Sequence, residues 1–289
     1  MLYDALIAPF TEFEFMRRAL VGAVAIALGA GPMGVFLMLR RMSLTGDAMA
    51  HAILPGAAVG FLMAGLSLPA MTVGGIIAGV IVAMLAGLVT RATPLKEDAS
   101  LAAFYLLSLA LGVTIVSLRG SNVDLLHVLF GTVLALDDAA LLLLAAIATV
   151  TLVTLSVLYR PLVLECVDPS FLRSVSRAGT PTHLVFLGLV VLNLVGGFQA
   201  LGTLLAVGLM MLPAAAARFW SADITVMMLI ATGIGIASAL FGLLLSFHAE
   251  LPAGPAIIMV AGGVYLVSLA VGREGGLLWL AWPGRHLEA

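Results

Sequence analysis

Residues 178–217 read AGTPTHLVFLGLVVLNLVGGFQALGTLLAVGLMMLPAAAA and contain no Asp, Glu, Lys or Arg. A single helix of this length would be ~60 Å long, about twice the thickness of the hydrocarbon core of a bilayer. The stretch must therefore break. Gly196-Gly197 and Gly202 allow a break, and Pro213 indicates that the second piece is short or kinked. The segment therefore predicts two membrane helices.

The composition of the whole chain supports a membrane protein. Of 289 residues, 63% are hydrophobic and only 10% are charged, and the mean hydropathy is +1.22. Such a chain is surrounded by lipid, and a net charge of -2 leaves no basic face for nucleic acid. The single cysteine, Cys166, excludes an internal disulfide, and we expect it in an exposed cytosolic loop. No linker divides the chain, so residues 1–289 are interpreted as one transmembrane domain.

Nine apolar segments approach the ~20 residues that a membrane helix needs, and helices satisfy their own backbone groups in lipid. The excess of Lys and Arg on one side places the N-terminus outside and the C-terminus in the cytosol. The sequence thus predicts an all-α integral membrane protein, a polytopic bundle of eight or nine helices with one broken or short helix. The predicted spans are at about 19–39, 48–66, 70–90, 99–118, 139–159, 182–198, 200–217, 224–247 and 252–271.

Several enzyme motifs are absent from the sequence. A Walker A loop requires Gly-Lys-Ser/Thr, but the only lysine, Lys96, follows Pro94-Leu95. Neither a His-Glu-x-x-His zinc motif nor a Gly-x-Ser-x-Gly elbow occurs. The chain is therefore predicted to be no enzyme and to lack an ATPase site of its own.

The stretch Gly46-Asp47-Ala48-Met49-Ala50-His51 places a carboxylate and an imidazole four residues apart at the cytosolic start of the second span. Residues i and i+4 project side by side from a helix. One oxygen and one nitrogen ligand suit Zn²⁺, Mn²⁺ or Fe²⁺ better than Mg²⁺ or Ca²⁺. Two protein ligands leave coordination positions open, as a transient stop on a transport path requires.

A purely structural interpretation of the same pair is that Asp47 caps the second span and His51 bonds a neighbouring carbonyl. The spacing alone does not separate the two interpretations. Asp47 is, however, one of the few acids that can reach membrane depth, where ionisable groups are costly. This favours Asp47 and His51 as metal ligands, and one side chain can serve both roles.

The other histidines are weaker candidates. His127 with Asp124, and His248 with Glu250, are expected at or near the outer face, where either pair could form a funnel for a cation. Interfacial polar residues are common, so no defined site is expected there. His183 and His286 are interpreted as solvated residues at membrane boundaries.

The largest cytosolic loop, about 160–181, has the signals of a short helix. Asp168 is placed as N-cap before Pro169, and Gly179 as the stop before Pro181. The face expected to dock on a partner protein contains Phe171, Leu172, Val175 and Ala178, with Arg177 on its flank. An interfacial helix lying on the bilayer is the alternative. Because only two basic residues would anchor it, docking on a partner is favoured.

Taken together, three motifs resemble the permease subunit of the bacterial zinc, manganese and iron ABC importers. They occur in the family's order between residues 15 and 272. The first is Arg40-Arg41-Met42-Ser43 with Gly46-Asp47 and Ala50-His51. The second runs from Gly202-Thr203-Leu204-Leu205 to Pro213-Ala214-Ala215, and the third is Pro252-Ala253-Gly254-Pro255.

This resemblance implies a homodimer in the bacterial inner membrane, two cytosolic ABC ATPase subunits and an external metal-binding receptor. It implies metal import driven by ATP on the partner subunit, with no permanently bound cofactor. Asp47 and His51 match the pair that lines and gates the metal path, and residues 168–179 match the loop seated on the ATPase. The loop is more basic than is usual in the family, which leaves the choice of ATPase open.

Two other functions remain alternatives. A secondary metal transporter driven by an ion gradient would use Asp47 for proton coupling, and an intramembrane enzyme would use Asp and His with a metal. The helix expected in the cytosolic loop argues against both. Zinc is preferred over manganese as the transported ion, although Asp plus His accepts either.

Overall fold

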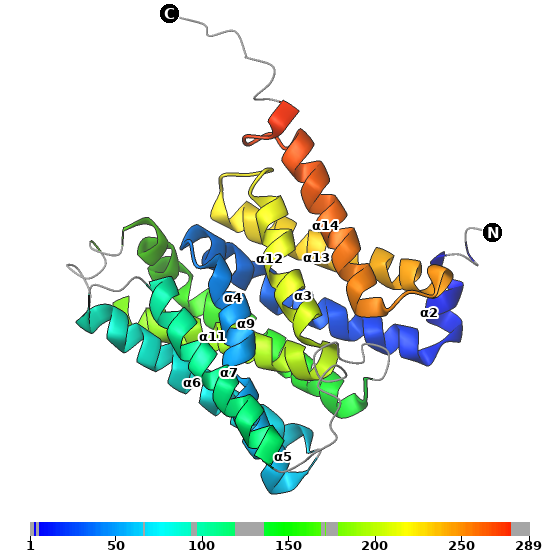
Figure 1. The fold of residues 1–289 in the computed structure, drawn as a ribbon. Coiled ribbons are helices and arrows are strands. Elements are labelled where there is room, and N and C mark those ends of the chain that lie inside the picture. The colour runs from blue at the N-terminus through cyan, green and yellow to red at the C-terminus, as the bar shows by residue number, and fades with distance from the viewer. Residues whose placement is uncertain are drawn as a thin grey trace, which may run out of the picture.

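The computed structural model describes residues 3, 6–65, 67–93, 97–118, 136–168, 171 and 179–278, and its described segments are helical or connect helices. Figure 1 shows a bundle in which the N-terminal α2 lies close to the ends of α13 and α14. The prediction of an all-α membrane bundle is confirmed. The helices are α2 (Ala8–Glu12), α3 (Glu14–Leu39), α4 (Ser43–Ala52), α5 (Leu54–Ala64), α6 (Leu68–Ala92), α7 (Glu97–Leu118), α9 (Asp138–Val167), α11 (Gly179–Leu201), α12 (Thr203–Ala217), α13 (Ile224–Ala249) and α14 (Ala253–Val271).

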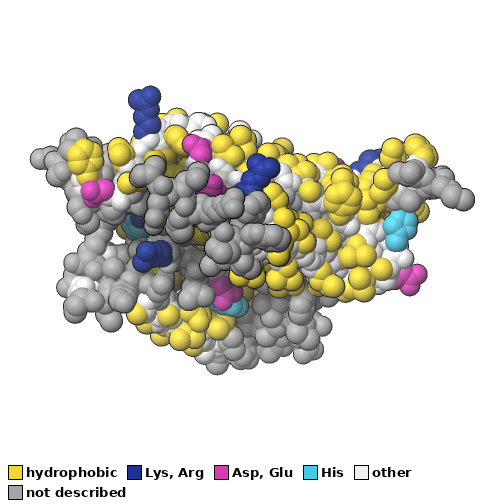
Figure 2. Space-filling view, turned by 90° about the horizontal axis from the view of Figure 1, so that it is seen from above, with side chains coloured by type: hydrophobic (Ala, Val, Ile, Leu, Met, Phe, Trp, Pro, Cys, Tyr) yellow, Lys and Arg dark blue, Asp and Glu magenta, His cyan; other side chains and the backbone are white. Residues whose placement is uncertain are grey.

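Seven segments in the described part of the chain are long and apolar enough to cross a membrane, and α12 and the stretch Ala99–Gly112 of α7 are shorter apolar helices. Together they account for the nine predicted spans. Hydrophobic side chains cover much of the visible surface, and charged groups are few and scattered (Figure 2). A surface of this kind is expected where helices face lipid.

The helix α3 is the centre of the larger group of helices. It packs against α9, α11, α12 and α13. In an apolar stretch of 18 residues within α3, 72% is buried inside the protein. The helices α5, α6 and α7 pack against one another as a second group, which α4 and α11 join to the first (Figure 1). The short α4 is therefore in contact with both groups.

The uncharged stretch 178–217 breaks as predicted. Leu201 ends α11, Gly202 has φ 92°, and α12 begins at Thr203. Glycine adopts this left-handed conformation without the steric cost that a side chain brings. Gly196 and Gly197, the other predicted place for the break, remain inside α11. A Cβ on Gly197 would lie 2.6 Å from Ala206 Cβ, so this glycine allows α11 and α12 to pack closely.

The second span is broken, which the sequence analysis did not predict. α4 ends at Ala52 and α5 begins at Leu54, because Pro55 has no backbone N–H and its ring obstructs a continuous helix. The hydroxyl of Ser108 on α7 donates to the carbonyl oxygen of Ala52 at 2.8 Å. A neighbouring helix thus satisfies a backbone group at the break, as a membrane interior requires.

The fifth span is longer than predicted. α9 continues to Val167 with Pro161 inside it, so residues 160–167 belong to a helix instead of to the cytosolic loop. Cys166 accordingly lies in the last turn of α9 and is partly buried. The expectation that it lies in an exposed loop is wrong. The connection between α9 and α11 is correspondingly short, from Asp168 to residue 178.

Candidate functional site

The connection between α3 and α4 is a tight helix C-terminus. The N–H of Met42 donates to Leu37 O at 2.9 Å and the N–H of Arg41 to Met38 O at 3.0 Å, the hydrogen-bond pattern of a Schellman motif. Arg41 occupies its left-handed position with φ 59°. Met42 is 3% exposed and directly precedes α4. Only two residues, both held by backbone hydrogen bonds, therefore separate Arg40 from α4.

Asp47 and His51 lie on successive turns of α4, as the i, i+4 spacing predicts. Nε2 of His51 is 3.8 Å from Oδ1 of Asp47. The side chain of Asp47 is 66% exposed and that of His51 is 30% exposed. Because α4 begins at Ser43, Asp47 lies in its second turn. The alternative in which Asp47 caps the helix is wrong.

The two ring nitrogens of His51 have different surroundings, and Nε2 is the one that faces Asp47. Its Nδ1 is buried and has no hydrogen-bond partner among the described residues, so no carbonyl bond of the expected structural kind is present. The ring centroid lies 6.1 Å from that of Tyr105 on α7. Within the described ranges no group of three or more His, Cys, Asp or Glu side chains comes together. One chain therefore offers an ion two ligands at this site.

The other side of α4 is fixed by packing. Met49 is fully buried, Ala50 is 2% exposed, and α4 contacts α7, α11 and α12. A Cβ on Gly46 would lie 2.9 Å from Met211 Cε of α12. The backbone of the helix is thus held on three sides while Asp47 remains accessible.

The start of the cytosolic loop has the predicted cap. Oδ1 of Asp168 accepts from the backbone N–H of Phe171 at 2.9 Å, the bond expected of an N-cap residue to the third helical position. Phe171 is 52% exposed, as a docking side chain should be. Leu172, Val175, Ala178 and Arg177 lie outside the described residues. Gly179, predicted to stop the loop helix, is instead the first residue of α11.

Both ends of this loop are joined to α3 by a buried polar cluster that sequence reasoning missed. Nη2 of Arg40 donates to Glu165 Oε1 at 3.3 Å and to His183 Nδ1 at 2.6 Å. The three side chains are 10%, 11% and 9% exposed. His183 is therefore buried, and the interpretation of it as a solvated boundary residue is wrong. These residues are 125 and 143 positions apart, and no local pattern links them.

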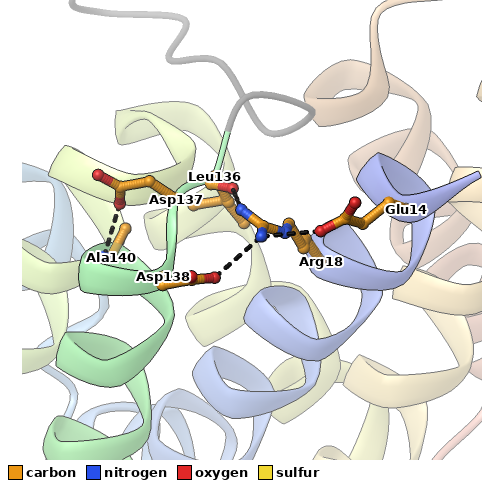
Figure 3. Close-up of polar contacts among 6 residues, drawn as sticks. All are labelled: Glu14, Arg18, Leu136, Asp137, Asp138 and Ala140. Atoms are coloured by element: carbon orange, nitrogen blue, oxygen red, sulfur yellow. Dashed lines mark hydrogen bonds and ion pairs between the residues drawn. The ribbon is translucent and has the colours of Figure 1, made fainter.

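A second, exposed cluster joins α3 to α9 at their other ends (Figure 3). Nη2 of Arg18 lies 2.8 Å from Glu14 Oε1 and 3.0 Å from Asp138 Oδ1, and Nη1 donates to the carbonyl oxygen of Leu136 at 3.3 Å. The carboxylates are 65% and 87% exposed. Exposed ion pairs of this kind contribute little to stability.

The predicted outer-face histidine pairs have no built site in the described part of the chain. Glu250 is exposed and ends α13 in a left-handed conformation, and exposed His248 stacks edge-on against Phe247 at 5.4 Å. Asp124 and His127 lie outside the described residues, as does His286. The expectation that neither pair forms a defined site stays a prediction.

Comparisons with known proteins agree with this architecture. The model of the ABC 3 transport family matches residues 12–272. The manganese import system permease protein ScaB of Streptococcus parasanguinis is 31% identical over 90% of this chain and 91% of its own length. The manganese transport system membrane protein MntC of Halalkalibacterium halodurans is 30% identical over 96% and 94%. The solved structure of PsaBC from Streptococcus pneumoniae in complex with Fab superimposes with a TM-score of 0.84 at 27% identity, covering 97% of this chain and all of that chain.

Proposed function

The chain belongs to the ABC 3 transport family and is a multi-pass permease of a bacterial metal ABC importer, and on this premise we propose that it moves manganese into the cytoplasm. The observation that carries the choice of ion is the manganese function named for relatives about 30% identical over nearly the full chain. A site of one carboxylate and one imidazole accepts Mn²⁺ and Zn²⁺ alike. The preference for zinc drawn from the sequence therefore gives way to manganese, with zinc or iron as the second candidate.

We propose Asp47 and His51 as the ligands of the ion during its passage. Each chain supplies one oxygen and one nitrogen from adjacent turns of α4, and Oδ1 of Asp47 and Nε2 of His51 lie 3.8 Å apart. In a homodimer with two-fold symmetry, the same surface of both copies meets at the axis, so two such pairs can face one path. An incomplete, partly exposed ligand set binds weakly enough to release the ion.

The energy for transport comes from ATP on other subunits in this proposal. The sequence has no Walker A loop, and the loop of residues 168–179 exposes Phe171 behind the cap made by Asp168. We propose that two cytosolic ATPases bind this loop in the two permease copies and that an external receptor delivers the ion. No cofactor is bound permanently, and the transported metal and the ATP on the partner are the only small ligands.

The proposed cycle follows from these positions. Closure of the ATPases on ATP displaces residues 168–179, and the displacement rocks the paired helix bundles. The path beside α4 is then exposed alternately to the two sides of the membrane. Asp47 and His51 hold the ion between these states. An ion-gradient carrier, in contrast, would leave the loop without a function, and no observation favours it.

ATP-dependent uptake of radioactive manganese, with zinc as competitor, tests the proposal. Cells express the chain with and without its ATPase partner, and a D47A/H51A variant is compared at equal protein level. Uptake that requires the ATPase, prefers manganese and is lost in the variant is expected. Stronger uptake of zinc would correct the ion, while uptake that ignores the ATPase but collapses with an uncoupler would replace an ABC importer by a secondary carrier.

A further inference from the structure

A buried Arg–Glu–His cluster is unusual enough in a membrane protein to need a reason. Breaking such a cluster leaves an uncompensated charge, and replacing it with apolar side chains is often neutral or stabilising. Stability alone therefore gives little explanation for Arg40, Glu165 and His183. Their positions in the chain suggest another role.

The cluster joins both ends of the cytosolic loop to the helix before the metal ligands. Glu165 lies three residues before Asp168, and His183 lies four residues after Gly179. Arg40 is the C-cap of α3 and bonds both of them through one nitrogen, Nη2. A displacement of either end of the loop must therefore move Arg40 or break a buried hydrogen bond.

The chemistry of Arg40 defines the protonation of His183. An arginine side chain has donors only, so Nδ1 of His183, 2.6 Å from Nη2, is the acceptor. His183 is then neutral, and its 3.8 Å separation from Glu165 Oε1 is not an ion pair. The guanidinium also lies 4.8 Å above the ring of Phe186 on α11. Arg40 is held on two sides by α11 and on a third by α9.

The connection between Arg40 and α4 is short, so a displacement of Arg40 is expected to displace α4 as well. Only Arg41 and Met42 separate Arg40 from α4, and both donate backbone hydrogen bonds to the last turn of α3. Nη1 of Arg40 is buried without a partner among the described residues, so the cluster has an unused donor with which a second arrangement can form. Asp47 and His51 lie on the second and the last turn of α4, which begins at Ser43.

We propose that Arg40, Glu165 and His183 are positioning residues that couple movement of the loop at 168–179 to the metal-binding helix α4. The proposal rests on the function proposed above for that loop. The cluster does not bind the ion, and it acts through the connection between α3 and α4. Loss of the cluster should raise the number of ATP molecules hydrolysed per ion imported, while the transporter remains assembled.

The test is the number of ATP molecules hydrolysed per manganese ion imported. The permease is purified in complex with its ATPase and reconstituted in vesicles with the external receptor. An R40M/E165M variant removes both charges together, so neither partner of this ion pair is left buried alone, and the complex is expected to assemble at wild-type level. The ATP-to-manganese ratio should rise at least about fivefold, the lower end of typical coupling between sites.

Two substitutions of His183 test the proposal independently. His183→Asn keeps an acceptor near the position of Nδ1, while His183→Leu removes it. His183→Asn should keep the ratio near the wild-type value and His183→Leu should raise it, each measured on the fraction that purifies as a complex. If His183→Leu and His183→Asn give the same ratio, the role of His183 is overturned.

The exposed cluster of Figure 3 offers a matched control. An R18M/D138N variant breaks the ion pair between the same two helices, α3 and α9, at their other ends. Its ratio should equal that of the wild type. A wild-type ratio in R40M/E165M, or an equal rise in R18M/D138N, would overturn the coupling proposal. A wild-type permease that retains no ATPase would overturn the proposed function instead.

Discussion

Gly56 on α5 and Gly74 on α6 face each other so closely that a Cβ on either would collide with the carbonyl oxygen of the other. The two helices pack along this contact, which the absence of side chains makes possible. The group formed by α5, α6 and α7 therefore depends on two small residues in different helices. Their role is visible only once both helices are in place.

Gly74→Ala should destabilise the permease by about 1–3 kcal/mol, because the new Cβ would collide with the backbone of Gly56, which cannot rotate away as a side chain can. Gly87→Ala on the same helix is the control, since an added Cβ there meets nothing within 4 Å. It should be neutral or stabilising by about 0.5 kcal/mol, as alanine favours the helix. Thermal unfolding in detergent measures both. Equal unfolding temperatures for the two variants would contradict the close helix contact.

Asp47→Asn should lower manganese uptake at least about tenfold while protein abundance stays unchanged, because the carboxylate is a proposed ligand yet is 66% exposed. Asp138→Asn is the matched change at an exposed carboxylate far from α4, and it should leave uptake near wild type. Initial uptake rates at equal protein level make the comparison. Normal uptake by Asp47→Asn would remove this carboxylate from the path.

Asp168→Ala should reduce the amount of ATPase that co-purifies with the permease. Its carboxylate accepts from the N–H of Phe171, and loss of such a cap costs about 1 kcal/mol of local stability. Asp223 caps α13 in the same way, accepting from Val226 N at 2.9 Å, so Asp223→Ala serves as the control. The two variants should differ in retained ATPase and have similar unfolding temperatures. Equal retention would show that this cap does not shape the docking surface.

Ser108→Ala should lower the unfolding temperature, because the buried hydroxyl satisfies the carbonyl oxygen of Ala52 where α4 and α5 separate. The expected loss is about 1 kcal/mol, in line with hydrogen bonds between membrane helices. Ser156→Ala removes an exposed hydroxyl that donates to Leu152 O of its own helix, and it should have no measurable effect. If both variants unfold like the wild type, water or another donor must serve Ala52.

Much of the architecture is predictable from local sequence. The uncharged stretch 178–217 predicted two helices, and the structure breaks it at Gly202. The i, i+4 spacing predicted that Asp47 and His51 lie together, and the signals around Asp168 predicted its cap. Each prediction rests on residues that are close together in the sequence or on one continuous apolar stretch. The break at Pro55 was missed because the apolar run 48–66 is long enough for an uninterrupted span.

The sequence by itself determined that this chain is a helical membrane bundle with an Asp–His pair at the start of one span, since hydropathy and helical spacing are local properties. Only the tertiary structure decided that His183 is buried and that Arg40 joins it to Glu165. The contacts among these residues span 125 and 143 positions of sequence. They form only when α3, α9 and α11 pack together, because each of the three helices contributes one residue and the cluster is buried between them.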